Sequence, residues 1–551
     1  MALPENEFLV SPDVLVDQGL VHQQNGRLAE AEVLYNLALV QEPHHVEALH
    51  LLGLVRHQTG RFPEAVELIQ KAISFKASPC PVLLTNVGAA MQESKRWEEA
   101  EESYRRAIQA KRDYLPAHEN LCRLLPIRGK TLAAADAWMD LGNQFLDVGK
   151  PQEAYIRYRL AFQFKPDDAG LLHGLATTLA GQGRLEESLS MYRASLSKDS
   201  KSALCLTNLG WVQSQLGRLD EAVGNFRQAI LLAPEYAEAH MCLAATLLRM
   251  GQFSEGWAEY EWRWKSLAKQ FVRPARSQQE WRGESLAGRT LLVESEQGLG
   301  DILQFVRYVE LLRTNGDRVL FRCPEPLQPL LRACSTFGDC MIRSEEALPH
   351  FDFFVPLLSL PRIFGTTVET VPANIPYLQA PTNRVEAWRE RLGGQKTFRI
   401  GIVWQGSTSY RDDSQRSFHL NKFGPLAYFP GVELVCLQKG NGTEQLKQIS
   451  FPVRTLGDAF DGDGPFLDTA AVMKNLDLVI APNTSLAHLA GALNVPVWVI
   501  LSGVASDWRW ISNRDDSPWY PSMRLFRQKA GGDWDEVFNR VYGEVAKISR
   551  T

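Results

Sequence analysis

Glu294-Ser-Glu-Gln-Gly-Leu-Gly-Asp301 and Ala481-Pro-Asn-Thr-Ser-Leu-Ala-His488 are two short turns, each of which follows an apolar run. Around each turn, short apolar runs alternate with helical patterns, which is typical of βαβ units and a parallel sheet. Ligands of such sheets bind at the carboxyl ends of the strands. Two such turns, one in each of two successive α/β halves, indicate a phosphate-bearing ligand held in a cleft.

The two halves are defined by apolar runs that are bounded by turns. The expected strands are residues 290–294, 318–321, 351–356, 398–404, 432–437, 476–481 and 495–501. The expected helices between them are residues 302–314, 327–333, 469–475 and 485–493. The pattern stops at the polar stretch 393–396 and then begins again, which predicts two Rossmann-like halves, 289–392 and 393–551.

Residues 1–264 show a different period. Gly26 and Gly60 are 34 residues apart, and the same spacing recurs from Gly149 through Gly183 and Gly217 to Gly251. A recurring 34-residue unit of two helical patterns is the tetratricopeptide signature. A small residue on the first helix and an aromatic residue on the second recur at fixed positions, as in Gly19 with Tyr35. We therefore predict a solenoid of about seven repeats, with an irregular, bending element near 115–134.

The groove of such a solenoid is a binding surface for protein partners. The sixth position of the repeats, which points into the groove, holds Asn86, Asn120 and Asn208. These residues resemble the asparagine ladder with which O-GlcNAc transferases hold substrate peptide backbones, since an amide both donates and accepts hydrogen bonds. A scaffold without peptide capture is the alternative interpretation.

The stretch between the solenoid and the α/β halves is dense in aromatic residues. Gly251-Gln-Phe-Ser-Glu-Gly-Trp-Ala-Glu-Tyr-Glu-Trp-Arg-Trp264 contains three tryptophans and a tyrosine. Such residues are expected to cap the stack by packing on the next domain, and a sugar-stacking site is the alternative. Residues 265–288 are polar and are expected to form a linker that docks on the neighbouring domain.

Composition narrows the class of protein. The chain has 551 residues, of which 45% are apolar and 22% charged, and this suits an ordinary globular protein of about three domains. A net charge of −5 offers no electrostatic reason for nucleic-acid or membrane-surface binding. The eight cysteines form no Cys-x-x-Cys pair, and residues 1–16 have no basic signal region. A cytoplasmic protein without a membrane span is the resulting expectation.

The first turn contains two glycines that let a backbone approach a ligand closely, Gly298 and Gly300, and we place both on the acceptor side. A dinucleotide fingerprint would need a third glycine at position 303, where Leu303 stands. Asp301 opens the following helix. It is either a helix cap or a general base that faces the cleft.

The second turn leads from a buried strand into a helix at a run of hydroxyl and amide side chains. The free N–H groups and the dipole of a helix start favour an anion. Thr484 and Ser485 add hydroxyl donors, and His488 lies one turn further on. We expect these three residues to contact a phosphate, although a lone histidine on a helix is more often a core residue.

Asn483-Thr-Ser-Leu-Ala-His-Leu-Ala-Gly-Ala-Leu-Asn-Val-Pro496 resembles the donor motif of heptosyltransferase-like glycosyltransferases (glycosyltransferase family 9). Gly300-Asp301 is similar to the Gly-Asp turn of that family. The segments 507–510, 516–522 and 525–528 also match, so the chain looks like bacterial proteins that join tetratricopeptide repeats to this transferase domain. The resemblance implies a GT-B fold, a nucleotide-sugar donor, inversion at the anomeric carbon and no essential metal or other cofactor.

The resemblance also assigns roles. Asp301 would be the catalytic base, while Asn483, Thr484, Ser485 and His488 would hold the donor diphosphate. Gln405 and Gly406 follow the first strand of the second half, where the family places donor contacts. The polar run 411–417 follows them, with Arg416 as the phosphate cation. Lys439, at the end of the next strand, is a second cation.

The donor motif and the run before Arg416 depart from the family pattern, and that run lacks the usual family spacing of Asn, His and Asp. Asn483 stands where the family commonly has aspartate, which removes a negative charge near the donor. Asp461-Gly-Asp463 spells a manganese-binding Asp-x-Asp, but it lies in a glycine-rich loop and is interpreted as a solvated turn.

The leading hypothesis is a metal-independent, inverting glycosyltransferase that selects a protein acceptor through its solenoid. One alternative is a scaffold whose degenerate transferase domain only binds a nucleotide, and Asn483 supports that alternative. Another is a lipid- or saccharide-directed transferase whose repeats recruit partners. Self-association into a homo-oligomer is compatible with each hypothesis.

Overall fold

The structure is a computed structural model that describes residues 10–266, 273, 275–314, 318–342, 347–394, 397–408, 413–503, 507–529 and 532–549. Contacts divide the chain into two compact units, one ending at Val212 and the other beginning at Gln213. The described part of the first unit is helical, whereas the second combines helices with two β-sheets. No described helix is long and apolar enough to cross a membrane.

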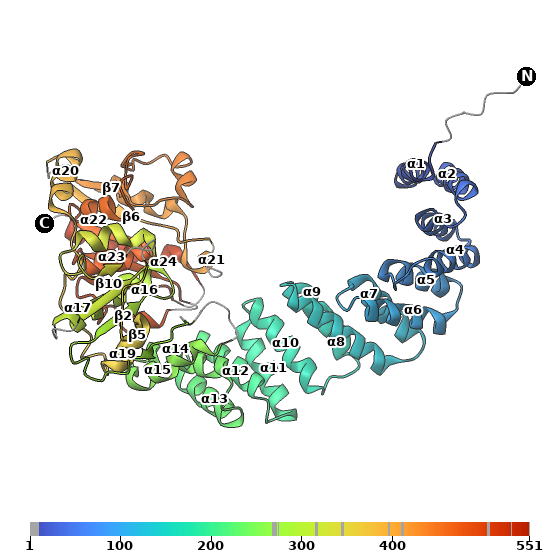
Figure 1. The fold of residues 1–551 in the computed structure, drawn as a ribbon, viewed down its shortest axis with the longest axis horizontal. Helices are drawn as coiled ribbons and strands as arrows, with labels where there is room; N and C mark the ends of the chain where they lie inside the picture. The colour runs from blue at the N-terminus through green and yellow to red at the C-terminus, as the bar shows by residue number, and fades with distance from the viewer. Residues whose placement is uncertain are drawn as a thin grey trace, which may run out of the picture. The chain divides into compact units, whose positions relative to one another are not determined.

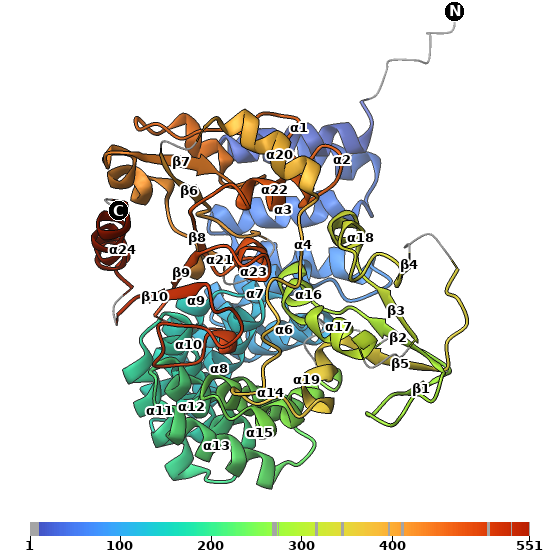
Figure 2. The same cartoon turned by 90° about the vertical axis from the view of Figure 1, so that its left-hand side faces the viewer.

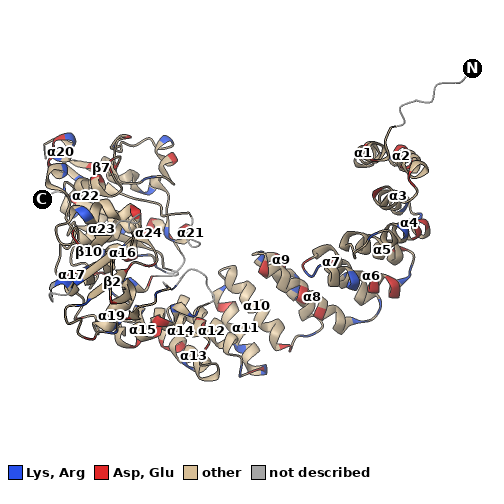
Figure 3. Ribbon diagram, viewed as in Figure 1, with Lys and Arg blue, Asp and Glu red and all other residues tan. Residues whose placement is uncertain are grey.

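The helices from residue 12 to residue 260 follow one another as hairpins (Figure 1). Their bounds are α1 (Pro12–Gln24), α2 (Leu28–Gln41), α3 (Val46–Gln58), α4 (Phe62–Ser74), α5 (Pro81–Glu93), α6 (Trp97–Ala110), α7 (Leu115–Ile127), α8 (Thr131–Asp147), α9 (Pro151–Phe162), α10 (Ala169–Gly181), α11 (Leu185–Lys198), α12 (Ala203–Gln215), α13 (Leu219–Leu232), α14 (Ala237–Arg249) and α15 (Phe253–Tyr260). Basic and acidic residues are interspersed along them (Figure 3).

The turn within each hairpin contains a residue in the left-handed conformation, which ends the first helix. Glycine adopts this conformation without a steric cost, which explains its recurrence in the sequence. The φ angles lie between 60° and 78° at Gly26, Gly60, Lys95, Gly129, Gly149, Gly183, Gly217 and Gly251. The predicted tetratricopeptide turns are therefore confirmed, with Lys95 in place of one glycine.

Helix α8 accounts for the irregular spacing. Lys95 and Gly129 are a regular 34 residues apart, whereas only 20 residues separate Gly129 from Gly149. The 17-residue α8 fills that interval and packs against both α7 and α9. It is the second helix of one hairpin and the first of the next. The irregular spacing predicted near 115–134 thus coincides with the shared helix α8, whereas α7 is a continuous helix with Pro126 in its last turn.

Small residues and aromatic rings explain how the paired helices approach each other. A Cβ added at Gly19 would lie 2.6 Å from Tyr35 Cε1, and one added at Gly142 would lie 2.7 Å from Tyr158 Cε1. Both tyrosine rings are buried. The ring therefore occupies the space that a larger residue on the first helix would need, as the repeat pattern predicts.

The second unit contains two five-stranded sheets whose neighbouring strands are all parallel. One sheet has the order β1-β5-β2-β3-β4 and the other β10-β9-β8-β6-β7. The strands are β1 (Gln279–Glu280), β2 (Thr290–Glu294), β3 (Arg318–Arg322), β4 (Met341–Ile342), β5 (Phe353–Pro356), β6 (Phe398–Ile402), β7 (Val432–Cys436), β8 (Leu478–Pro482), β9 (Val497–Leu501) and β10 (Met523–Arg527).

Helices cover both sheets. Their bounds are η1 (Glu261–Trp264), α16 (Leu299–Phe305), α17 (Arg307–Thr314), η2 (Glu325–Leu327), α18 (Gln328–Ala333), η3 (Leu357–Ser359), α19 (Leu360–Ile363), α20 (Thr382–Leu392), α21 (Asp413–Arg416), η4 (Leu420–Tyr428), η5 (Thr443–Lys447), α22 (Leu467–Met473), α23 (Ser485–Ala492), η6 (Trp508–Trp510) and α24 (Trp534–Ile548). Helices α16 and α23 pack against each other between the two sheets (Figure 2). The predicted combination of a helical array with parallel α/β structure is confirmed.

The last helical hairpin packs into the core of the α/β region. Trp257 of α15 is 1% exposed and makes edge-to-face contacts with Phe305 and Trp508. The linker also docks, because its residues 279–280 form β1 beside β5. Residues 267–272 and 274 of the linker lie outside the described residues. Aromatic packing of the kind expected from the sequence thus joins the end of the array to the α/β region.

Candidate functional site

A cleft of about 1130 Å³ lies between the two sheets and is lined by both of the polar turns. Asp301 follows β2, which lies between β5 and β3 in the first sheet, so that the strand order reverses beside β2. Thr484 follows β8, which lies beside β6 at the corresponding point of the second sheet. Ligands of parallel sheets bind at such switch points. The position and size of the cleft suit a small-molecule or cofactor-sized ligand.

Asp301 acts as a helix cap and also faces the cleft. Its Oδ2 accepts a hydrogen bond of 2.8 Å from the backbone N–H of Gly298. Its Oδ1 forms an ion pair with Arg509, and 18% of its side chain is exposed. The two interpretations drawn from the sequence are therefore compatible, since capping and ion pairing leave the carboxylate among the cleft-lining groups.

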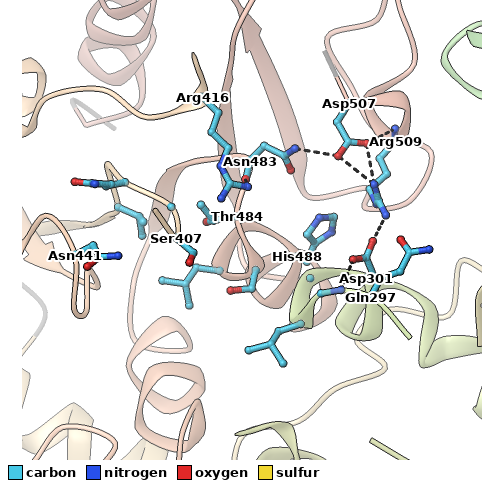
Figure 4. Close-up of a pocket in the computed structure, with 18 of the residues that line it drawn as sticks. Gln297, Asp301, Ser407, Arg416, Asn441, Asn483, Thr484, His488, Asp507 and Arg509 are labelled. Carbon is cyan, nitrogen blue, oxygen red and sulfur yellow. Dashed lines mark hydrogen bonds and ion pairs between the residues drawn. The ribbon is translucent and has the colours of Figure 1, made fainter. Parts of the chain in front are cut away.

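The ion pair continues across the cleft as a chain of contacts (Figure 4). Arg509 Nη1 donates to Asp507 Oδ1 at 2.9 Å and to Oδ2 at 3.0 Å. The amide nitrogen of Asn483 donates to Asp507 Oδ2 at 3.1 Å. The Asn483 amide therefore contacts a carboxylate, and a different segment of the chain supplies that carboxylate.

Burial and charge set the protonation of this chain of residues. Burial raises the pKa of Asp301, and the guanidinium of Arg509 offsets part of that rise. Burial acts in the same direction on Asp507, but Arg509 and the Asn483 amide outweigh it and hold the pKa of Asp507 below its usual range. A carboxyl group with a raised pKa is a stronger base than an ordinary aspartate.

The turn before α23 presents an unused hydroxyl group. Thr484 occupies the N-cap position in extended backbone conformation, but its side chain caps no amide of the helix. The Oγ1 atom is buried and has no hydrogen-bond partner among the described residues. Because buried hydroxyl groups are normally satisfied, this atom marks a place for a ligand or a water molecule. Ser485 lines the cleft beside it.

His488 lies at the cleft but is 4% exposed. Its Nδ1 is 3.0 Å from the hydroxyl of Tyr520, and its ring stacks on Trp510 with centroids 5.2 Å apart. Burial, assisted by Arg509, lowers the pKa of His488 to about 3. The ring is therefore neutral, so any contact with a phosphate would be a hydrogen bond rather than an ion pair.

The residues predicted after β6 are held by one another. Arg416 Nη1 donates to the carbonyl of Asn483 at 2.9 Å, and its Nε donates to Asp413 Oδ1 at 2.9 Å. Gly406 has no side chain, which leaves room for this ion pair over its backbone. Gln405 and Gly406 line the cleft together with Arg416. Residues 411 and 412 of the predicted polar run lie outside the described residues.

Gln438 and Lys439 follow β7, and both line the cleft. Gln438 Oε1 accepts hydrogen bonds of 3.1 Å from the backbone N–H groups of Trp404 and Gln405, which joins the ends of β6 and β7. Lys439 Nζ lies 3.2 Å from the carbonyl of Phe460 and 3.4 Å from Asp461 Oδ2. Lys439 lines the cleft but is partly neutralised there.

The prediction that the Asp-x-Asp sequence is a solvated turn is wrong for its first aspartate. Asp461 is 8% exposed, and its Oδ1 accepts hydrogen bonds of 2.7 and 2.9 Å from the N–H groups of Asp468 and Thr469 at the start of α22. Only Asp463 is solvated, in an ion pair with Arg384. Asp461 is a buried cap because the turn folds back onto α22. No group of three or more described His, Cys, Asp or Glu residues is placed to hold a metal ion.

The glycines of the first turn have a structural reason. The Gly298 N–H satisfies Asp301, and a Cβ added at Gly300 would lie 3.0 Å from His488 Cδ2. Gly300 therefore allows α16 and α23 to approach closely, and both glycines also line the cleft. Their assignment to the acceptor side stays a prediction.

The predicted asparagine ladder lies in the first unit, and two of its members are paired with histidines. Asn86 Nδ2 donates to His50 Nε2 at 2.8 Å, and Asn208 Nδ2 donates to His173 Nε2 at 3.0 Å. All three asparagines, including Asn120, are half-buried. Peptide capture by these asparagines stays a prediction.

The end of the helical array forms part of the cleft wall. Tyr260 of α15 exchanges hydrogen bonds of 3.1 and 2.9 Å with the side chain of Gln297 in the first turn. Gln215 of α12 and Ala245 of α14 also line the cleft. The last hairpins therefore contribute side chains to the candidate site itself.

Asp507, Arg509 and Tyr260 received no role from the sequence. A signal was present for the first two, because they follow β9 at the carboxyl edge of the second sheet. The contact of Arg509 with Asp301 in the first half depends on how the two halves meet, and no spacing in the sequence encodes that.

Comparisons with known proteins establish the repeats. Tetratricopeptide-repeat family models match residues 16–79 and 167–235. A curated relative, Protein FlbA of Caulobacter vibrioides, is 25% identical over 497 residues, which cover 78% of this chain and 80% of FlbA. The repeats are thus shown by family models, and the likeness to FlbA extends over most of both chains.

Other relatives are covered only in part. Protein O-mannosyl-transferase TMTC1 of Homo sapiens is 26% identical over 39% of this chain, and the match spans 26% of TMTC1. Cellulose synthase operon protein C of Pseudomonas fluorescens is 28% identical over 41% of this chain, and the match spans 18% of that protein. Among solved structures, the tetratricopeptide-repeat protein YrrB matches 37% of this chain at 16% identity with a TM-score of 0.20.

Proposed function

We propose that this protein is a glycosyltransferase that moves a sugar from a nucleotide-sugar donor to an acceptor hydroxyl in the cleft between its two α/β halves. The observation that carries the proposal is that Asp301 and the turn before α23 line one cavity from opposite sheets. The two parallel sheets with the cleft between them suit the GT-B architecture that the sequence motifs imply. The partial match to a protein O-mannosyl-transferase supports the same class of reaction.

The second half would bind the donor diphosphate. The first N–H groups of α23 have no partners within the helix and, with the helix dipole, favour an anion. Thr484 adds a hydroxyl group that has no partner among the described residues. Arg416 lies beside the same turn, where its guanidinium contacts the carbonyl of Asn483. These groups would stabilise the negative charge of the leaving nucleotide.

Asp301 would act on the acceptor. Its carboxylate would take the proton of the acceptor hydroxyl while the hydroxyl oxygen attacks the anomeric carbon. The bond between that carbon and the donor phosphate oxygen would break, and the nucleotide would leave with the electron pair. Attack on the face opposite the leaving group inverts the anomeric centre. The raised pKa of Asp301 favours this role as a base.

The acceptor is proposed to be a protein. Tetratricopeptide arrays present grooves for polypeptides, and residues of the last hairpins line the cleft beside Gly298 and Gly300. An acceptor chain held by the array would thus have side chains of that array next to Asp301. The groove asparagines would contribute their amide groups to the hold on that chain.

Binding of nucleotides to the turn before α23 tests the donor site. We expect one of UDP, GDP, ADP or CMP, or its sugar, to raise the unfolding temperature, since a ligand at one hundred times its Kd adds about 2.7 kcal/mol. Thr484→Val should leave the ligand-free protein as stable as before, because the buried hydroxyl has no partner, but should reduce the shift.

Thr59→Val is the matched control, since Thr59 lies in the first unit and its hydroxyl bonds to the carbonyl of Val55. It should leave the nucleotide-induced shift unchanged. A shift with none of the nucleotides, or an equal shift in both variants, would contradict the proposed donor site.

A further inference from the structure

Arg509 is held by protein groups on all three of its nitrogens. Its Nε donates to Gln304 Oε1 at 2.9 Å, Nη1 contacts both oxygens of Asp507, and Nη2 contacts Asp301. Only 9% of its side chain is exposed. A guanidinium group with this many partners is poorly placed to bind a phosphate directly, but it is well placed to fix the orientation of the carboxylates that it contacts.

The contacts of Arg509 connect the two halves at the cleft. Asp301 belongs to α16 beside the first sheet, whereas Arg509 belongs to η6, which follows β9 of the second sheet. Asp507 joins the same group to Asn483, immediately before α23. Figure 4 shows Arg509 between the two carboxylates, with its guanidinium directed to Asp301.

We propose that Arg509 is a positioning residue for Asp301: anchored by Asp507, it reaches across the cleft and holds the Asp301 carboxylate in the orientation needed to accept the acceptor's proton. The proposal rests on the proposed function, in which Asp301 is the base. It also assigns a role to Asp507, whose carboxylate holds Arg509 and the turn before α23 in place relative to each other.

The charges around Asp301 support this arrangement. Arg509 and Asp507 face it from the segment after β9 and Tyr260 faces it from α15, while neutral His488 of α23 lies beside the neighbouring Gly300. Two carboxylates share one guanidinium, so one negative charge remains within the group. A buried carboxylate is tolerated when it is paired, and both aspartates are ion-paired with Arg509.

Removal of the guanidinium has a consequence for pH dependence. Burial raises the pKa of Asp301 and Arg509 lowers it, so the pKa of Asp301 should rise further in Arg509→Gln. The base is active when it is deprotonated. The acid limb of kcat/KM should therefore move to higher pH, by about one to three units for the loss of an adjacent opposite charge.

The test measures donor turnover against pH in wild type, Arg509→Gln, Arg509→Lys, Asp301→Asn and the double variant Asp301→Asn/Arg509→Gln. We expect Arg509→Gln to lower kcat/KM at least tenfold near neutral pH and to shift the acid limb. Arg509→Lys, which keeps the charge but not the fork of donors, should retain the limb and lose part of the rate. The double variant should be no slower than Asp301→Asn alone, since Arg509 acts through Asp301.

Arg514→Gln is the matched control, because Arg514 lies in the same segment and pairs with the exposed Asp516. It should leave the pH profile unchanged, and thermal unfolding checks that each variant is folded. An unmoved acid limb in Arg509→Gln, or a further loss in the double variant, would overturn the proposal while Asp301 could still be the base. Absence of turnover in the wild type would overturn the proposed function, and with it the positioning role.

Discussion

At the scale of single residues, the Asn483 amide decides which residue carries the negative charge near the start of α23. Asn483 stands where related motifs carry aspartate, and its nitrogen donates to Asp507 at 3.1 Å. The negative charge near the start of α23 therefore comes from Asp507, which a different segment supplies. The asparagine suits this neighbour because an amide can donate to a carboxylate, whereas a second carboxylate would repel it.

Moving the carboxylate between these two positions tests this explanation. Asn483→Asp should place two carboxylates against each other and lower the free energy of unfolding by about 1–3 kcal/mol at neutral pH. Like charges raise the pKa of one partner, so stability is retained at acid pH and lost as pH rises through that raised pKa. Thermal unfolding at several pH values measures the effect.

The double variant Asn483→Asp/Asp507→Asn exchanges the two groups and should lose clearly less stability than the sum of the two single variants, although the ion pair of Asp507 with Arg509 is not restored in it. Each single variant disturbs the same hydrogen bond, so their effects should not add. Additive losses in the double variant would show that Asn483 and Asp507 do not act on each other.

At the scale of elements, two glycines of one hairpin have different effects on its stability. Gly217 ends α12 with a φ of 77°, whereas Gly224 lies inside α13 with no atom within 4 Å of an added Cβ. The first glycine is needed for the turn, and the second only lowers the helix propensity of α13. The 34-residue spacing distinguishes them, because Gly217 belongs to it and Gly224 does not.

Alanine at the two positions should therefore have opposite effects. Gly217→Ala should cost about 1–2 kcal/mol, since an L-residue is strained in the left-handed region. Gly224→Ala should add up to about 1 kcal/mol, since alanine favours the helix and meets no neighbour. Chemical denaturation of the two variants measures both values. A loss of stability in Gly224→Ala would contradict the open space at that position.

The elements also show how far the sequence reaches. The strand predicted at 290–294 agrees with β2, and the helix predicted at 485–493 agrees closely with α23. Both segments have a buried apolar pattern that is bounded by turns. The sharing of α8 by two hairpins was missed, because a count of repeats assigns each helix to one hairpin. The strand pattern also does not predict β10, because residues 525–528 stand out only as a segment that resembles the family.

At the scale of the whole molecule, the sequence predicts which segments meet but not every contact between them. The turns after β6 and β8 lie at one edge of the second sheet, as parallel strands predict, and the turn after β2 lines the same cleft from the first sheet. The bridge from Arg509 to Asp301 could not be predicted, since it depends on the packing of the two halves. The sequence also does not predict the burial of Asp461, because that burial depends on how its turn folds back onto α22.

The measurement that tests the central claim is release of nucleotide from UDP-, GDP-, ADP- and CMP-sugars by the full-length protein and by Asp301→Asn, with an extract of cellular proteins as acceptor. We predict release with one donor class, accompanied by transfer of labelled sugar to protein. The rate should fall by about 10²–10⁴ in Asp301→Asn while nucleotide binding is retained. No release with any donor, or equal rates in the two proteins, would contradict the account.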